Sequence, residues 1–330
     1  METEPLVSVL VASFNHERYV EQALDSVVAQ SYLNLELIIV DDCSTDQSVD
    51  RIRRWMDRTG QPTVLIVNEE NRGICAVLNQ LLARSSGEYC VLLDTDDWME
   101  PDRVLRHVDH FASLDPDVVL VFGDAAVHHE NGRSVGESFL SQTLGDESVP
   151  DGAAVFDRLL KGNFIPTSTV TVRRSAITDA GGYDESLSFD DYEMWLRLSH
   201  RSRFSYCDEI VANYRVVASS MSHSDEWMPS MARSTITILQ RWAAVDDVQE
   251  VPSRCHAVAG HLRRVARSIA PFDAASAQGA LRTAEQLVPS FRWRMIDQMR
   301  VFHWPGGAAL VEGTRALRRS RASRQSASAA

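Results

Sequence analysis

"VSVLVASFNHERYVEQALDSVVAQSYLNLELIIVDD" occupies residues 7–42 and decides the fold class. The stretch begins and ends with runs rich in Val, Ile and Leu, and between them Val20, Leu24 and Val27 recur at helical spacing. An apolar strand, an amphipathic helix and a second apolar strand form the repeating unit of a parallel sheet that is covered on both faces. We therefore expect an α/β fold with a mostly parallel sheet and helices on both of its faces.

The same alternation continues along the first half of the chain. Further apolar runs lie at residues 63–69, 88–94 and 117–123. In open sheets of this kind, a ligand binds where the strands end, at their carboxyl edge. Asp42 follows one strand, and Asp94, Asp96 and Asp97 follow another, so we expect both acid clusters at the same edge of the sheet.

The composition bounds the partners of the chain. Its length of 330 residues suits one large domain with an extension, or two domains. The composition, 44% hydrophobic and 24% charged, is typical of a globular protein. The net charge of -13 argues against nucleic acid, because such binding needs a basic face. A nucleotide is still compatible with this charge, because a divalent cation can join phosphates to carboxylates.

Cysteine usage and the N-terminus indicate a cytoplasmic location. The N-terminal "METEPLVSVLVAS" carries acids where a signal peptide would carry basic residues, and no apolar run approaches the ~18 residues that span a bilayer. The cysteines lack metal-ligand spacing, which indicates free thiols in a reducing compartment. They are Cys43, Cys75, Cys90, Cys207 and Cys255.

Three acidic motifs are candidates for chemistry, and each also has a structural interpretation. In "DTDD" (94–97), two carboxylates at D-x-D spacing suit Mg²⁺ or Mn²⁺, although an Asp-rich turn before a helix explains them equally well. "VDDCSTDQS" (40–48) is either a capping turn or a carboxylate that accepts hydrogen bonds from a base or ribose. "FDDYEMWLRL" (189–198) is either a capped helix start or the site of a general base.

The motifs together resemble the family 2 glycosyltransferases of GT-A fold. The resemblance rests on the order and spacing of the segments 7–46, "NRGICAVLNQLLARSSGEYCVLLDTDDWMEPDRV" (71–104) and "GGYDESLSFDDYEMWLRL" (181–198). It extends from about residue 6 to residue 217. It implies an inverting transfer of a sugar from a nucleotide-sugar, most often UDP-linked, to an acceptor hydroxyl.

The resemblance assigns residues to the nucleotide. Ser13 and Asn15 match the N-terminal loop that meets the nucleotide, and Asp42 matches the carboxylate that reads the base or ribose. Asn71 and Arg72 match a loop near the nucleotide that follows the third strand.

The resemblance also assigns the metal and the base. Asp94 and Asp96 match the metal motif for Mn²⁺ or Mg²⁺, with Asp96 as the direct ligand and Asp94 also facing the nucleotide-sugar. Asp191 matches the catalytic base, and Asp190 stands where relatives carry Glu. One position departs from the pattern: Val217 occupies the place of a His in the relatives' "YRxH", and His223 is a candidate substitute.

The acceptor side and the C-terminal region are less specified. "GNFIPTSTVTVRR" (162–174) resembles the segment under the acceptor, although its residues are equally good at the start of a strand. The acceptor candidates are Phe164, Ile165, Pro166, Thr167 and Trp195, the last of which is otherwise a core residue or a pocket wall.

The composition of the chain changes after about residue 229, where we expect Ala- and Arg-rich helices. We expect a GT-A catalytic domain over residues 1–228 and a helical extension over 229–330, with disorder from about 314–330. "FRWRMIDQMRVFHW" (291–304) is either a helix packed on the catalytic domain or a surface for peripheral contact with an anionic membrane, in which case the protein would lie at the inner face of the cell membrane.

The expected function is transfer of a sugar to a glycan or glycolipid acceptor in cell-surface polysaccharide biosynthesis. The alternative is a non-catalytic nucleotide-sugar-binding module of a biosynthetic assembly.

Overall fold

The computed structural model describes residues 4–218, 220 and 224–290. The chain divides into two compact units, Met1–Trp227 and Met228–Ala330. Of the predictions for the C-terminal region, the segment 291–304 and the expected disorder over about 314–330 lie outside the described residues, as does His223.

The first unit contains one sheet, which in the described part of the chain has nine strands in the order β3-β2-β1-β4-β8-β6-β9-β5, with β7 paired to β6. The strands are β1 (Val7–Ser13), β2 (Leu35–Asp41), β3 (Thr63–Val67), β4 (Tyr89–Asp94), β5 (Trp98–Met99), β6 (Val118–His129), β7 (Ser134–Ser138), β8 (Val170–Arg173) and β9 (Arg203–Val216). Strands β3, β2, β1 and β4 are mutually parallel, whereas β8 is antiparallel to both of its neighbours. The α/β class is confirmed. Parallel pairing is limited to strands β3, β2, β1 and β4 and to the β6–β9 pair.

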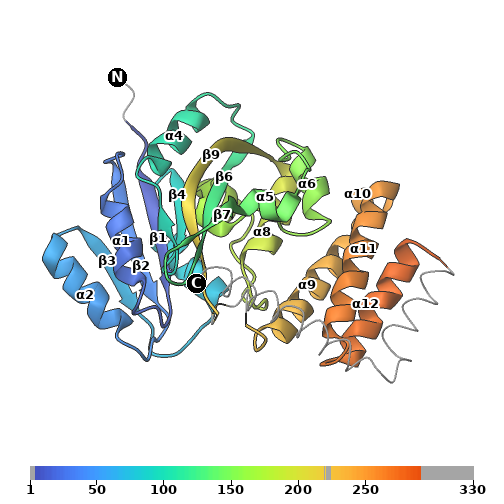
Figure 1. Ribbon diagram of the computed structural model, residues 1–330. Helices are drawn as coiled ribbons and strands as arrows, with labels where there is room; N and C mark the ends of the chain where they lie inside the picture. Colours follow the sequence, from blue (N-terminus) through green and yellow to red (C-terminus); the bar gives the residue numbers. More distant parts are fainter. Residues whose placement is uncertain (1–3, 219, 221–223, 291–330) are drawn as a thin grey trace. The chain divides into compact units, whose positions relative to one another are not determined.

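Helices cover both faces of the sheet, as the apolar periodicity predicts (Figure 1). They are α1 (Val20–Val28), α2 (Ser48–Thr59), α3 (Ile74–Arg84), α4 (Arg103–Ala112), α5 (Phe139–Leu144), α6 (Ala154–Leu159), α7 (Arg174–Asp179) and α8 (Asp191–Arg201), with a 3₁₀ turn at Thr167–Thr169. Val9 and Val11 of β1 share one fully buried cluster with Leu24 of α1 and Trp55 of α2. Helix α3 packs on the same strands β1 and β2.

The register of the parallel strands brings their polar ends together. Ser13, the last residue of β1, pairs with Asp41 of β2, and Ala12 pairs with Asp94 of β4. The prediction that the two acid clusters share one edge of the sheet is therefore confirmed.

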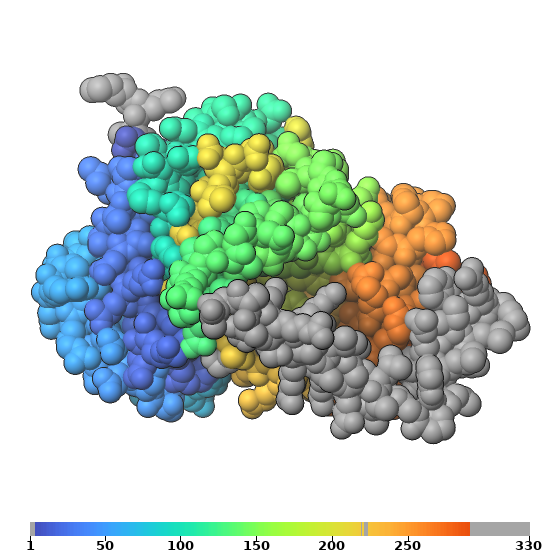
Figure 2. All heavy atoms as spheres, in the orientation of Figure 1, coloured from blue at the N-terminus to red at the C-terminus, as the bar shows by residue number. Residues whose placement is uncertain are grey.

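Strands β6 and β9 run beside each other as a long, bent pair (Figure 1). Register shifts interrupt their pairing near Gly123, where a Cβ atom would lie 2.6 Å from Val211 Cγ2 and 2.9 Å from the carbonyl oxygen of Glu209. Only glycine permits this close approach of the two backbones. In the space-filling view, the green segment that follows β6 covers much of the visible face of the first unit (Figure 2).

The second unit is helical over its described residues. It contains α9 (Met228–Ala243), α10 (Asp246–Gln249), α11 (Pro252–Ile269) and α12 (Ala274–Leu287). Helix α11 packs against α9 and α12, and fully buried alanines such as Ala259, Ala277 and Ala280 permit close helix contacts. Across residues 4–290, gaps aside, no helix has the length and apolarity needed to cross a membrane.

Candidate active site

The loops after β1 and β2 hold each other in place. Asn15 adopts a left-handed conformation with φ 54°, and its Oδ1 accepts a hydrogen bond from the Thr45 N–H at 2.8 Å. The Asn15 N–H donates to Ser44 Oγ at 2.8 Å, and Ser13 Oγ donates to Asp41 Oδ2 at 2.8 Å. Ser13 is buried and Asn15 is exposed, so of these two nucleotide candidates Asn15 has the accessible side chain.

Asp42 holds the loop that follows β3. Its carboxylate accepts hydrogen bonds from the backbone N–H groups of Arg72 and Gly73 at 2.9 Å each, and from Asn68 Nδ2 at 2.8 Å. The Asn71 side chain donates to the Asp42 carbonyl oxygen at 3.4 Å. Since the carboxylate is buried beneath these donors, its role in this structure is to shape the loop that carries Asn71 and Arg72.

A hollow of about 560 Å³ lies on this loop. Its size is within the usual range for small-molecule sites. It is lined by Val67, Asn68, Glu69, Glu70 and Arg72, so the exposed Arg72 and the loop held by Asp42 border one recess.

The "DTDD" turn at the carboxyl edge of the sheet contains one buried acid, Asp97, and two more accessible acids, Asp94 and Asp96. Asp97 is 4% exposed, and its Oδ1 accepts the Arg215 N–H at 2.8 Å. Asp94 and Asp96 are half-buried. Burial, followed by the charges of Asp96 and Asp191, raises the pKa of the Asp94 carboxyl to about 7. A nearby cation would stabilise the ionised form of Asp94.

Asp191 is the first residue of α8, and its carboxylate is held from two sides. Asn163 Nδ2 donates to Oδ2 at 2.6 Å and the Tyr192 N–H donates to Oδ1 at 2.6 Å. Burial raises the pKa of Asp191 to about 6, and the hydrogen bonds from Tyr192, Asn163 and Thr167 oppose that rise. An oriented carboxylate with such a pKa suits a general base near neutral pH.

The acids of β4 and α8 lie within electrostatic reach of each other, although they are far apart in the sequence. Asp191 contributes to the raised pKa of Asp94. Burial, followed by the charges of Asp191 and Asp94, raises the pKa of Asp190 well above its usual range. The structure therefore brings the predicted metal motif and the predicted base to one place.

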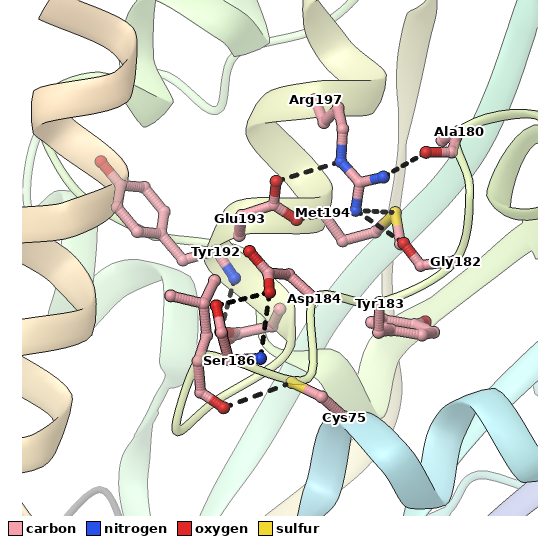
Figure 3. A network of polar contacts seen from close by, with 12 residues as sticks. Cys75, Ala180, Gly182, Tyr183, Asp184, Ser186, Tyr192, Glu193, Met194 and Arg197 are labelled. Carbon is pink, nitrogen blue, oxygen red and sulfur yellow. Dashed lines mark hydrogen bonds and ion pairs between the residues drawn. The ribbon is translucent and has the colours of Figure 1, made fainter.

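Arg197 holds the start of α8 against the loop that precedes it. Its Nε and Nη2 donate to the two oxygens of Glu193 at 3.0 and 2.7 Å, and Nη2 also donates to the Gly182 carbonyl at 2.8 Å (Figure 3). Nη1 donates to the carbonyl of Ala180. One side chain thus joins α8 to the loop that precedes it.

Helix α3 supports the same loop from the other side. Asn79 Nδ2 donates to the Tyr183 carbonyl at 3.0 Å and its Oδ1 accepts the Tyr183 N–H at 2.8 Å. The buried Cys75 thiol donates to the Phe189 carbonyl at 3.5 Å, next to Asp190. Burial raises the pKa of this thiol, which keeps it a neutral donor.

The burial of the acceptor candidates corrects part of that prediction. Phe164 and Trp195 are 0% exposed, and Phe164 packs edge-on against Phe122 at a ring distance of 5.9 Å. In this structure both side chains lie in the core and present no surface to an acceptor. Ile165 and Pro166 are also buried, whereas Thr167 is half-buried and bonds to Asp191.

Three residues near these acids were missed by the sequence reasoning. His16 Nδ1 and Thr95 Oγ1 share a hydrogen bond of 2.8 Å, which ties the β1 loop to "DTDD". Asn163 contacts Asp191, and Arg215 contacts Asp97. Each follows or precedes a motif by a few residues, but only the fold reveals its partner. Val217, which replaces the family's His, is buried.

The oxygen donors present suit a hard cation that is also bound by a diphosphate. Asp94 and Asp96 supply carboxylate oxygens, which Mg²⁺ and Mn²⁺ prefer. Among the described residues, no group of three or more His, Cys, Asp or Glu side chains is placed to hold a metal by itself. A cation here would therefore take further ligands from the phosphates of a donor.

The sequence is similar to those of known glycosyltransferases. TuaG of Bacillus subtilis (strain 168), assigned as a teichuronic acid biosynthesis glycosyltransferase, is 29% identical over 68% of this chain and 84% of its own length. Glycosyltransferase GlyA of Streptococcus pneumoniae serotype 4 is 32% identical over 46% of this chain, and the match spans 21% of GlyA.

Solved structures share the fold. The mannosyltransferase PcManGT of Pyrobaculum calidifontis, in complex with GDP-Man and Mn²⁺, has a TM-score of 0.60 at 20% identity, covering 96% of this chain and 81% of PcManGT. Residues 1–349 of Staphylococcus aureus TarS, with UDP-GlcNAc, have a TM-score of 0.55 at 18% identity, covering 88% of this chain and 92% of that one. The fold is therefore that of GT-A glycosyltransferases.

The family model described as glycosyl transferase family 2 matches residues 8–179, more than half of the chain. The sequence motifs, the edge where they meet and this match agree, and the chain belongs to glycosyl transferase family 2.

Proposed function

We propose that this protein is a metal-dependent, inverting glycosyltransferase that uses a UDP-linked sugar and acts in cell-surface polysaccharide biosynthesis. The observation that carries the proposal is the convergence of Asp94 and Asp96 with Asp191 at the carboxyl edge of the sheet. The TuaG relative and the TarS complex with UDP-GlcNAc support the substrate class.

The roles of the residues follow from their surroundings. The loop held by Asp42 would receive the nucleotide through Asn71 and Arg72, and Asn15 would contribute from the loop after β1. Asp94 and Asp96 would hold Mn²⁺ or Mg²⁺ at the diphosphate. When bound, the cation stabilises the negative charge that develops on the leaving nucleotide.

Asp191 would take the proton of the acceptor hydroxyl. Its Oδ2 is oriented by Asn163, and the start of α8, where Asp191 lies, is joined to the preceding loop by Arg197. Attack by the activated hydroxyl on the face opposite the leaving nucleotide inverts the anomeric centre. Thr167, half-buried beside Asp191, is the remaining acceptor-side candidate. The acceptor in this proposal is a hydroxyl of a glycan or glycolipid.

A donor panel tests the proposal. Purified protein is incubated with UDP-, GDP-, dTDP- and CMP-sugars, each with Mn²⁺ and with chelator, and donor loss is measured by mass spectrometry in the presence of a mixed glycan acceptor pool. We expect Mn²⁺-dependent loss of one UDP-sugar. Loss of a GDP-sugar would correct the nucleotide, and tight nucleotide-sugar binding without turnover of any donor would instead favour a non-catalytic binding module.

A further inference from the structure

Arg215 of β9 contacts the "DTDD" turn through both its backbone and its side chain. Its N–H donates to Asp97 Oδ1 at 2.8 Å, and its Nε donates to the Asp96 carbonyl oxygen at 2.9 Å. Arg215 is 5% exposed, so these bonds are shielded from water. Strand β9 therefore holds the backbone of the proposed metal ligand Asp96 through Arg215.

The rest of the guanidinium joins this turn to two other segments. Nη2 donates to Gln22 Oε1 on α1 at 2.7 Å, and Nη1 donates to the Glu130 carbonyl between β6 and β7 at 3.3 Å. The Arg215 guanidinium carbon lies 4.8 Å from the ring centre of Tyr19 and 4.7 Å from that of Trp98. All three guanidinium nitrogens have partners, so the group is rigidly placed.

The charge of Arg215 suits this location. The turn carries Asp94, Asp96 and Asp97, whose carboxylates repel one another, and a buried positive charge beside them offsets part of that repulsion. The planar guanidinium can donate in three directions while it stacks on aromatic rings, which a lysine ammonium cannot reproduce.

We infer that Arg215 is the positioning residue of the metal-binding turn: it sets the place of the Asp96 carboxylate and links the turn to α1 and to the β6–β7 connection. The inference rests on the proposed function, because Asp96 is a ligand only in a metal-dependent enzyme. Residues that orient metal ligands commonly contribute about 10–100-fold to metal affinity.

Arg173 provides a matched control elsewhere in the same sheet. Its guanidinium carbon also lies near two aromatic rings, 5.2 Å from that of Tyr89 and 5.1 Å from that of Phe111, and its Nε donates to the Val118 carbonyl at 3.1 Å. Arg173 pairs with Tyr89, the first residue of β4, whereas Asp94 is the last residue of that strand. Arg173→Lys therefore disturbs a similar contact at the opposite end of the strand.

The test measures metal binding directly. Mn²⁺ is titrated into wild type, Arg215→Lys and Arg173→Lys with UDP present, and free Mn²⁺ is followed by electron paramagnetic resonance. Calorimetry gives the UDP affinity in chelator, and melting curves report folding. We expect Arg215→Lys to weaken Mn²⁺ binding by about 10–100-fold with UDP affinity in chelator unchanged, and Arg173→Lys to change neither.

Wild-type Mn²⁺ affinity in folded Arg215→Lys would overturn the inference and leave the proposed function intact. UDP binding by wild type that does not respond to Mn²⁺ would instead overturn the metal-dependent function itself. If Arg215→Lys does not fold, Gln22→Ala removes a single guanidinium partner outside the turn. A loss of Mn²⁺ affinity in Gln22→Ala, smaller than the roughly 10–100-fold expected for Arg215→Lys, would support the inference. No loss would refute it.

Discussion

The two halves of the sheet edge use their acids in opposite ways. At the ends of β1 and β2, Asp41 and Asp42 are surrounded by donors from Ser13, Ser44 and the loop after β3. At the end of β4 and the start of α8, burial raises the pKa values of Asp94, Asp190 and Asp191, and the charge of Asp191 adds to the rise at Asp94 and Asp190.

This difference separates acids that shape the site from acids available for chemistry. A carboxylate that accepts several backbone N–H groups has little capacity left for a ligand, but it fixes a loop. Carboxylates that raise each other's pKa store repulsion that a cation or a proton relieves.

The largest effect is expected from Asp191→Asn. The amide cannot take the proton of an acceptor hydroxyl, so turnover should fall by about 10²–10⁴-fold while nucleotide affinity is retained. Steady-state kinetics and calorimetry on one preparation check both. Asp179→Asn, at an exposed acid of α7, is the control and should behave as wild type. Parallel loss of binding and turnover in Asp191→Asn would contradict the base assignment.

Asp42→Asn tests the shaping half of the comparison. An amide nitrogen in place of one carboxylate oxygen would face the N–H groups of Arg72 and Gly73, so we expect a loss of about 1–3 kcal/mol in the free energy of unfolding without ligand. Chemical denaturation measures it, with the exposed Asp57→Asn as control. If stability were unchanged while nucleotide affinity fell, Asp42 would be a direct reader of the base rather than a support for the loop.

Asn163→Ala examines how the base is held ionised. Wild-type turnover should decline as pH falls through about 6, the raised pKa of Asp191. Loss of the Asn163 hydrogen bond disfavours the ionised form and should move this acid limb upward by about one pH unit. A pH–rate profile of both proteins decides the matter, and an unshifted acid limb would show that Asn163 does not tune the base.

The smallest effect concerns stability and the cation. Because folding raises the pKa values of Asp94 and Asp191, the folded state binds protons more tightly than the unfolded chain, and stability falls as pH rises from near 4 through about 6 to 7. Mn²⁺ with UDP should stabilise the ionised form of Asp94, so the rise in melting temperature should be a few degrees larger at pH 8 than at pH 5.5. Equal shifts at both pH values would argue against a cation at these acids.

Periodicity and strand ends were enough to predict the α/β class and the shared edge. Apolar runs identify β1, β2 and β4, and parallel register then places Asp41 and Asp94 together. The helix that begins at Asp191 was also expected from its acidic start and apolar face.

In the region 124–190, the short helices depend on tertiary contacts and carry no periodic signal in the sequence. Helices α5, α6 and α7 have six residues each, too short for a periodic signal or for stability on their own. The use of individual side chains was hidden for a similar reason. Nothing local shows that Asp42 is saturated by backbone donors or that Phe164 and Trp195 turn into the core.

The division of labour between Asp96 and Asp191 is the central claim, and calorimetry of UDP binding with Mn²⁺ and with chelator tests it most directly. Wild type and Asp191→Asn should both bind UDP more tightly when Mn²⁺ is present, whereas Asp96→Ala should lose that gain and keep the affinity measured in chelator. A Mn²⁺-dependent gain that survives in Asp96→Ala, or that disappears in Asp191→Asn, would contradict the account.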